Sequence, residues 1–256
     1  MKSWTVLALL VAGAALVWIA VGQMPDGRLH VFLLDVDGGQ GVIVRSASGR
    51  VALIDGGSTP SVLLTALGRC LPFWQRSLRA VIATEQSNSA IAPLMDASKR
   101  YDIGIAVGPP TGSQPGAAYD SWRSILQEHR VPLIEAQEGM VVDLADGTLI
   151  EIADVTSTTI ALRISFGDTS LLLPGQRSSL PLPLDATVVA IPLPSKSTPG
   201  LSLAETVQAV VFFTGSQSGQ SKQLPPLSDV AVYSTQRDGS LELVSDGVQV
   251  EIRPHK

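Results

Sequence analysis

The strongest constraint on the fold is the alternation of short apolar strands with helices after Pro25. In the first half, β-branched segments bounded by glycine or polar residues are typical of strands: 29–34, 41–46, 50–55, 79–84 and 103–110. Helical periodicity follows them in three segments: 61–71, which ends before Pro72, then 91–101, then 119–130. The second half is rich in strand patterns from 141 to 254. This order predicts a mixed α+β or α/β domain with strand-rich halves.

The N-terminus carries a second strong signal. Residues 5–22 contain no charged side chain, with Lys2 before them and Asp26 and Arg28 after them. Eighteen such residues in a helix span about 27 Å, close to the ~30 Å thickness of a bilayer core. We therefore predict one transmembrane helix within residues 1–24, with a cleaved signal peptide as the alternative. Both interpretations place residues 25–256 outside the cytoplasm.

The composition excludes several classes of protein. The chain has 23 acidic and 18 basic residues, and its net charge of −5 gives no general attraction for nucleic acid. Cys70 is the single cysteine, so an internal disulfide is excluded, and its apolar surroundings in the sequence predict burial. The histidines His30, His129 and His255 have no metal-ligand spacing. We interpret them as ordinary side chains, with His255 in a tail that is expected to fray.

Several motifs follow one another in a fixed order. They are LHVFLLDVDGGQGVIV (29–44), RVALIDGG (50–57), ALGRCLPFWQRSLRAVIAT (66–84), VIATEQSNSAIAPL (81–94), ISFGDTSLLLPGQ (164–176) and VYSTQRDGSLELVSDG (232–247). Together they resemble the metallo-β-lactamase-like domain of the DNA-uptake competence protein ComEC. The resemblance covers nearly the whole chain after the N-terminus. It implies a four-layer αββα sandwich over residues 25–256.

That family binds two metal ions, mainly through a T-H-x-H-x-D-H segment, and this chain departs from the pattern. Thr84 matches the threonine, and Asp55 matches a supporting aspartate in the D-G-G turn. The ligand positions hold side chains that bind metals weakly or not at all: Glu85, Ser87, Ser89, Ala90, Gln176 and Leu193. A hydrolytic metal site needs several ligands that converge on each ion. We therefore predict no catalytic residue, no metal site and no cofactor.

Three smaller features leave alternatives open. Arg69, Arg76 and Arg79 form a local positive excess, either a solvated surface or a DNA contact. The segment LPFW (71–74) is either an exposed aromatic contact or a packing element at a helix end. Ser87 or Ser89 with Lys196 could form a Ser-Lys pair only if the fold brings them together.

These observations favour a catalytically inactive module at the cell membrane. We expect a single-pass protein whose domain faces outside the cytoplasm and binds an unknown protein partner. The resemblance connects it to DNA uptake, with weak DNA binding at most. The alternative is a hydrolase or nuclease of the same fold with a rebuilt or metal-independent site.

Overall fold

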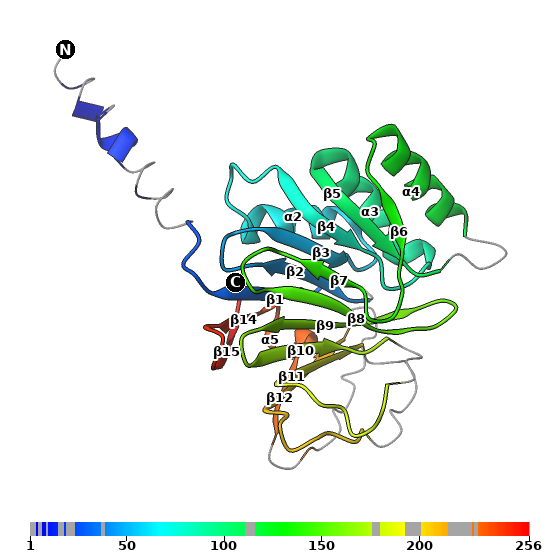
Figure 1. Cartoon of the computed structure of the whole chain (residues 1–256). Coiled ribbons are helices and arrows are strands. Elements are labelled where there is room, and N and C mark those ends of the chain that lie inside the picture. The colour runs from blue at the N-terminus through cyan, green and yellow to red at the C-terminus, as the bar shows by residue number, and fades with distance from the viewer. Residues whose placement is uncertain are drawn as a thin grey trace.

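The domain is a sandwich of two β-sheets (Figure 1). A computed structural model describes residues 24–36, 39–110, 116–175, 180–192, 201–214, 227 and 230–255, and positions 4, 7, 8, 10–14 and 18. The largest apolar core lies between the sheets, where Ile54 and Ile82 of one sheet face Leu162 and Val211 of the other. The predicted two-sheet α/β architecture is therefore confirmed.

The first sheet has the strand order β15-β14-β1-β2-β3-β4-β5-β6. Its strands are β1 (Leu29–Leu33), β2 (Gly41–Arg45), β3 (Val51–Asp55), β4 (Ser77–Ile82), β5 (Asp102–Gly108), β6 (Leu133–Glu135), β14 (Leu241–Ser245) and β15 (Val250–Pro254). Pairing is antiparallel from β15 to β3 and parallel from β3 to β6. In β3, Ala52 and Ile54 face the inner core, whereas Leu53 faces the helices. Burial on both faces explains why these strands read as continuous apolar runs.

The second sheet repeats this plan with the order β13-β12-β11-β10-β9-β8-β7. Its strands are β7 (Val141–Asp143), β8 (Leu149–Val155), β9 (Ile160–Phe166), β10 (Thr169–Leu173), β11 (Val188–Pro192), β12 (Ala209–Phe213) and β13 (Ala231–Ser234). Pairing is antiparallel from β7 to β10 and parallel from β10 to β13. The two halves thus share the same change from antiparallel to parallel pairing.

Three helices cover the outer face of the first sheet (Figure 1). They are α2 (Pro60–Cys70), α3 (Asn88–Arg100) and α4 (Ala117–Glu128), close to the predicted helical segments. Trp122 of α4 is fully buried, and its Nε1 donates a hydrogen bond to Ser98 Oγ of α3 at 3.0 Å. The short strand β6 was not predicted, because its three residues follow a proline and give no measurable alternation.

The predicted helical fourth layer falls largely outside the described residues. Among the described residues of that half, the one helix is the four-residue α5 (Thr235–Asp238). Irregular segments within 180–187 and 201–207 pack on this face, with Leu184, Ala186 and Val207 against Val189 and Phe212. Residues 180–184 read LPLPL, and proline at alternate positions removes the amide donors that a helix needs. Residues 193–200 and 215–226 lie outside the described part.

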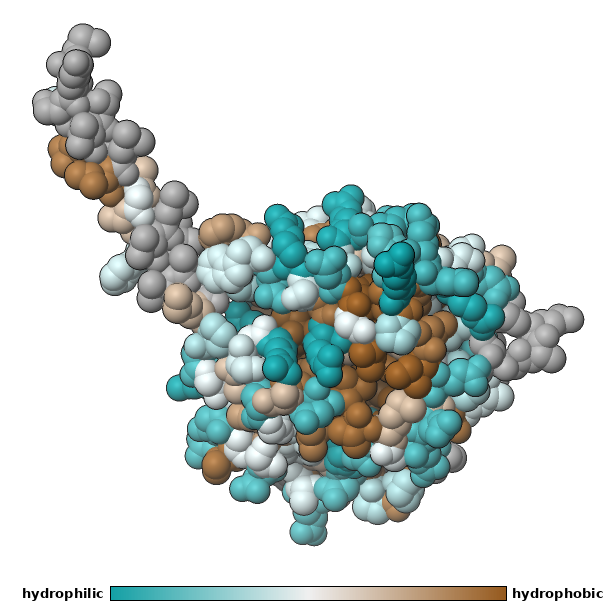
Figure 2. Space-filling model, turned by 45° about the horizontal axis from the view of Figure 1, so that its top comes forward, coloured by the Kyte–Doolittle hydropathy of each residue, from teal (hydrophilic) through white to brown (hydrophobic). Residues whose placement is uncertain are grey.

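The edge strands β6 and β7 lie toward the viewer in Figure 1. Ile134, Val141 and Leu149, from β6, β7 and β8, are each at least about one third exposed. Val141 and Leu149 alternate with Val142 and Ile150 of the inner core, so they lie on the outer face of the second sheet. Figure 2 shows apolar side chains gathered in the middle of the face turned forward, with hydrophilic ones around them.

The predicted membrane anchor falls largely outside the described residues. No helix among the described positions is long and apolar enough to cross a membrane. The positions that are described, including Leu7, Leu10 and Trp18, are exposed and stand apart from the sandwich (Figures 1 and 2). The division into residues 1–24 and 25–256 thus stays a prediction.

Candidate functional site

A cavity of about 380 Å³ lies where β3 and β4 end, opposite the ends of β10 and β11. The two sheets are joined beside it, because the Ile160 amide donates to the Thr84 carbonyl at 2.9 Å. The polar side chains in its described lining are Gln40, Asp55, Ser58, Thr84, Glu85, Ser89 and Thr159, and the rest is glycine, proline and Ala90. The ends of segments that are far apart in sequence therefore meet at the cavity.

Asp55 ends β3 in a left-handed backbone conformation, with φ of 50°. Gly57 follows with φ of 72°, and a Cβ there would lie 2.4 Å from Val36. Glycine is needed at such a position because both the positive φ and the lack of space exclude a side chain. The predicted strand-ending D-G-G turn is therefore confirmed, and it aims the Asp55 carboxylate at the end of β4.

The Asp55 carboxylate is buried and held by hydrogen bonds. The Thr84 amide donates to Oδ1 at 2.7 Å, and the Thr84 hydroxyl donates to Oδ2. Gln40 Nε2 donates to Oδ2 at 2.8 Å and also reaches Thr84 Oγ1 at 3.0 Å. Burial raises the pKa of Asp55 to about 6, although the bonds from Thr84 and Gln40 act in the opposite direction. The negative charge of Glu85 adds to the rise.

The next segment forms the start of α3. Ser87 is the residue before the helix, and its Oγ accepts from the Ala90 amide at 3.2 Å. The same Oγ donates to Glu85 Oε1 at 2.6 Å and lies 3.2 Å from Ser89 Oγ. Serine is preferred at this position because its oxygen satisfies an amide of the first turn. Ser87 thus has a structural role, whatever position it matches in the related motif.

The structure brings together only part of the predicted set. Asp55, Glu85, Ser89 and Ala90 line the cavity, and Ser87 lies next to them through its bond to Glu85. Gln176 and Leu193, like Pro194 and Lys196, lie outside the described residues, so the Ser-Lys pair stays untested. The described neighbours of those positions, Pro174, Gly175 and Pro192, do line the cavity.

Two lining residues were missed in the sequence. Gln40 joins Asp55 to Thr84, and its Oε1 is buried with no hydrogen-bond partner among the described residues. The signal was the G-Q-G in the first hairpin, within the motif of residues 29–44. Thr159 also lines the cavity, and its hydroxyl lies 2.9 Å from Thr156 Oγ1.

The described side chains of the cavity do not fit a transition-metal ion. The described residues contain no group of three or more His, Cys, Asp or Glu side chains placed to hold a metal ion. Imidazoles, the main ligands of transition metals, are absent from the described lining. The Asp55 carboxylate has roughly four lone-pair sites, and three of them accept hydrogen bonds from Thr84 and Gln40, which leaves little for a metal ion. What remains is a hydroxyl-rich cavity with two carboxylates.

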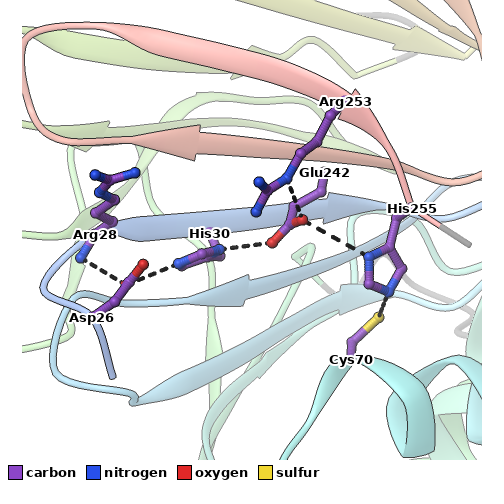
Figure 3. A network of polar contacts seen from close by, with 7 residues as sticks. All are labelled: Asp26, Arg28, His30, Cys70, Glu242, Arg253 and His255. Carbon is purple, nitrogen blue, oxygen red and sulfur yellow. Dashed lines mark hydrogen bonds and ion pairs between the residues drawn. The ribbon is translucent and has the colours of Figure 1, made fainter. Parts of the chain in front are cut away.

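A second polar cluster lies on the first sheet (Figure 3). His30 is buried, and its ring nitrogens lie 2.7 Å from Glu242 Oε1 and 3.0 Å from Asp26 Oδ1. Burial alone would raise the pKa of Glu242, but hydrogen bonds from His30 and Arg253 outweigh it and lower that pKa to about 2. His30 therefore links the carboxylates of Asp26 and Glu242 through its two ring nitrogens, which is more than an ordinary core-edge side chain does.

The C-terminal strand brings His255 into the same cluster, and the expectation that this tail frays is wrong. The His255 amide donates to the Ser240 carbonyl at 2.7 Å, and its ring meets Phe32 edge-on at 4.9 Å. His255 Nε2 lies 3.6 Å from Cys70 Sγ. Burial, with the Glu242 charge, raises the pKa of the Cys70 thiol to about 12. The buried thiol predicted for Cys70 is confirmed, and at neutral pH it is protonated and a poor nucleophile.

Comparison with known proteins relies on structure rather than sequence. No family model matches the sequence, and no curated protein sequence matches it. Among solved structures, the chain is similar to the metallo-β-lactamase fold protein YhfI from Bacillus subtilis, with a TM-score of 0.51 and 16% identity. That match covers 72% of this chain and 85% of YhfI.

A second similar structure is a diphosphatase from the PhnP family, with a TM-score of 0.54 and 16% identity. It covers 84% of this chain and 98% of the diphosphatase. Identities this low establish the fold and no shared activity. The narrower resemblance to the competence-protein domain stays a prediction. The two-sheet topology and these two matches together show that the chain has the metallo-β-lactamase fold.

Proposed function

We propose that this protein is a membrane-anchored, extracytoplasmic binding module that uses the metallo-β-lactamase fold without its metal chemistry. The observation that carries the proposal is the state of Asp55. Its carboxylate is buried and bonded to Thr84 and Gln40, so it serves the turn and not an ion. Glu85, the nearest acidic side chain, accepts from Ser87. Neither carboxylate has imidazole or thiolate partners in the described lining.

The character of the cavity limits what it can bind. Its described lining contains no lysine, arginine or histidine, whereas it does contain Asp55 and Glu85. In the described lining, a phosphate group would meet carboxylate charge with no cation to offset the repulsion. A neutral or cationic ligand with hydrogen-bond donors fits better, because hydroxyl and carboxylate oxygens dominate the wall. We therefore propose a protein or small-molecule ligand of that character, and at most weak contact with DNA.

The anchor completes the proposal. The uncharged run of residues 5–22 is long enough to span a bilayer core, and it precedes the domain directly. The chain is expected to stay in the membrane fraction after a carbonate wash. Protease added outside the cell is expected to digest the domain. Recovery of a soluble chain that begins near Gln23 would show a cleaved signal peptide instead.

Metal independence is the central test. The purified chain is expected to hold no stoichiometric zinc or manganese by elemental analysis, and chelator is expected to leave its melting temperature unchanged. Added zinc or manganese should not raise the melting temperature, because a ligand that binds only the folded state stabilises it. Cys70→Ala is the control variant, since it removes the Cys70–His255 pair as a separate place for a metal. Metal binding that survives Cys70→Ala but is lost in Asp55→Ala would contradict the proposal.

The alternative function is a hydrolase with a rebuilt site. It is favoured by one observation, the cavity of about 380 Å³ with two carboxylates at the ends of β3 and β4. Because one similar structure is a diphosphatase, diphosphate esters are the substrates to test. Turnover that is lost in Glu85→Gln and kept in Glu138→Gln, an exposed carboxylate after β6, would establish this alternative.

A further inference from the structure

The segment that leads from the predicted anchor is fixed to the first sheet. Asp26 Oδ1 accepts from the Arg28 amide at 3.1 Å and lies 3.0 Å from His30 Nε2. Glu242 of β14 holds the other side of the His30 ring at 2.7 Å, and Arg253 Nε donates to Glu242 at 2.9 Å (Figure 3). Charge-assisted hydrogen bonds of this length are among the stronger polar contacts in proteins. The chain therefore leaves the domain at a defined place.

That place adjoins an exposed loop. Pro25 packs on the turn between β2 and β3, where a Cβ at Gly49 would lie 2.6 Å from Pro25 Cγ. The same turn shares a groove of about 500 Å³ with Gln75, Ser77 and Arg79 of the segment that enters β4. In Figure 1 the cyan loop before β4 lies on the side where the blue linker enters the domain. The linker, the turn and residues 71–76 thus form one end of the molecule.

The loop carries an exposed aromatic pair. Phe73 and Trp74 are 62% and 42% exposed, and their rings meet edge-on at 4.7 Å. Leu71, in contrast, is buried in the helix-side core. The LPFW segment therefore is both a packing element and an exposed aromatic contact. Its leucine packs in the core, and its aromatic rings face outward. Large aromatic side chains of this kind are typical of the interface between a bilayer and water.

Four exposed arginines lie at the same end of the molecule. Arg69 ends α2, Arg76 follows the aromatic rings, and Arg50 and Arg79 line the groove. In the part of the chain that the structure describes, none of these four takes part in an ion pair. Asp102 lies in the described lining of the same groove, Asp146 accepts from the Ser48 amide of the turn at 2.6 Å, and Asp26 lies in the linker. Four arginines therefore stand against three carboxylates at this end.

The tether between the anchor and this end is short. From Gly22, at the end of the uncharged run, to Asp26 the chain advances four residues, at most about 14 Å when fully extended. The headgroup layer on each side of a bilayer is itself about 5 to 8 Å thick. An anchored chain must therefore hold this end of the domain against the lipid headgroups.

We propose that Phe73, Trp74, Arg50, Arg69, Arg76 and Arg79 form a membrane-contact surface. The aromatic pair enters the headgroup region of an anionic phospholipid bilayer, and the arginines face the lipid phosphates. This surface rests on the proposed anchor and adds to it a fixed orientation of the domain. The cavity at the ends of β3 and β4 lies at the opposite ends of the same strands, so it faces away from the lipid.

The test uses the four tryptophans of the full chain. Trp4→Phe with Trp18→Phe leaves Trp74 and Trp122, and Trp122 is fully buried and serves as an internal reference. This variant is reconstituted in vesicles of phosphatidylcholine and phosphatidylglycerol, some with brominated acyl chains. Part of the emission is expected to be quenched by the brominated lipid. Adding Trp74→Phe is expected to abolish that quenching while the melting temperature stays within a few degrees.

The arginines predict a dependence on lipid charge. The double variant Arg69→Gln with Arg76→Gln is expected to weaken the docking of the domain surface on the bilayer. Its equilibrium constant should fall about fivefold per arginine, the factor that corresponds to ~1 kcal/mol each. Arg123→Gln on α4, an exposed arginine away from the surface, is the matched control and is expected to have no effect. Vesicles of phosphatidylcholine alone should mimic the double variant.

The outcomes separate the surface from the anchor. An anchored chain whose Trp74 stays unquenched in anionic vesicles would overturn the membrane-contact surface and leave the anchor intact. If the chain proves to be soluble after processing, the surface must by itself make it float with anionic vesicles. Failure to float would then overturn both. Single-stranded DNA that changes Trp74 emission where vesicles do not would assign the arginines to nucleic acid and also overturn the proposal.

Discussion

Thr84 donates to Asp55 twice, through its backbone amide at 2.7 Å and through its hydroxyl, across 29 positions of sequence. This pair joins the end of β3 to the end of β4 at the floor of the cavity. It also explains how a buried carboxylate is tolerated without a metal, because a buried charge is stable only when hydrogen bonds compensate for the lost water.

The first prediction removes the hydroxyl from this pair. Thr84→Val keeps the shape of the side chain, and it should lower the free energy of unfolding by about 2 kcal/mol at pH 8, the usual range for a bond to a charged group. Thr148→Val is the matched control, because Thr148 is fully buried and its Oγ1 has no partner among the described residues. That change should be neutral or stabilising. Urea unfolding of both variants measures the two changes. Equal losses of unfolding free energy would contradict a stabilising role for the Thr84–Asp55 pair.

The second prediction concerns pH. Burial raises the pKa of Asp55 to about 6, above the ordinary 3.8 of an exposed aspartate carboxyl. A raised pKa means that the folded state holds the proton more tightly, so this contribution is complete below about pH 4 and is lost as pH rises through about 6. Relative to Asp55→Asn, the wild-type chain should therefore lose about 3 kcal/mol of stability between pH 4 and pH 7. A pH-independent difference in urea unfolding would be inconsistent with a buried Asp55.

The third prediction concerns Glu242, whose contribution to stability depends on pH in the opposite direction to that of Asp55. Hydrogen bonds from His30 and Arg253 overcome the effect of burial and lower the pKa of Glu242 to about 2. Its contribution is therefore present at neutral pH and disappears as pH falls from about 4.5 toward 2. Glu242→Gln should cost about 2 kcal/mol at pH 7, in the range for bonds to charged groups. The exposed Glu251→Gln on β15 is the control, and thermal unfolding at several pH values gives both curves.

The fourth prediction tests Ser87 as a helix cap. Ser87→Ala should lower the free energy of unfolding by about 1 kcal/mol, because the Ala90 amide loses its partner. Ser121→Ala, in an exposed part of α4, should have little effect, since its hydroxyl only bonds back to the Ala117 carbonyl. If Ser87→Ala changed metal content but not stability, Ser87 would be a ligand position and the capping role would be wrong.

Much of the site could be read from its local motifs. The D-G-G turn places Asp55 at a strand end because glycine alone tolerates the backbone that follows. The segment after β4 lies at the cavity, where Glu85, Ser89 and Ala90 line it. Gln40 was missed because its contacts to Asp55 and Thr84 depend on how the first hairpin folds over two other strands. No local pattern encodes that approach.

The sequence by itself determined the order of strands and helices, because hydrophobic periodicity and turn residues act over a few neighbouring positions. Only the tertiary structure decided what those elements meet. His30 and Glu242 are 212 positions apart and become hydrogen-bond partners because β1 and β14 are neighbours in one sheet. On the second sheet, irregular segments within 180–187 and 201–207 cover part of the outer face, because an apolar sheet face can be covered by any chain that excludes water. Such long-range choices depend on packing and on the cost of burying charge, which no short stretch of sequence contains.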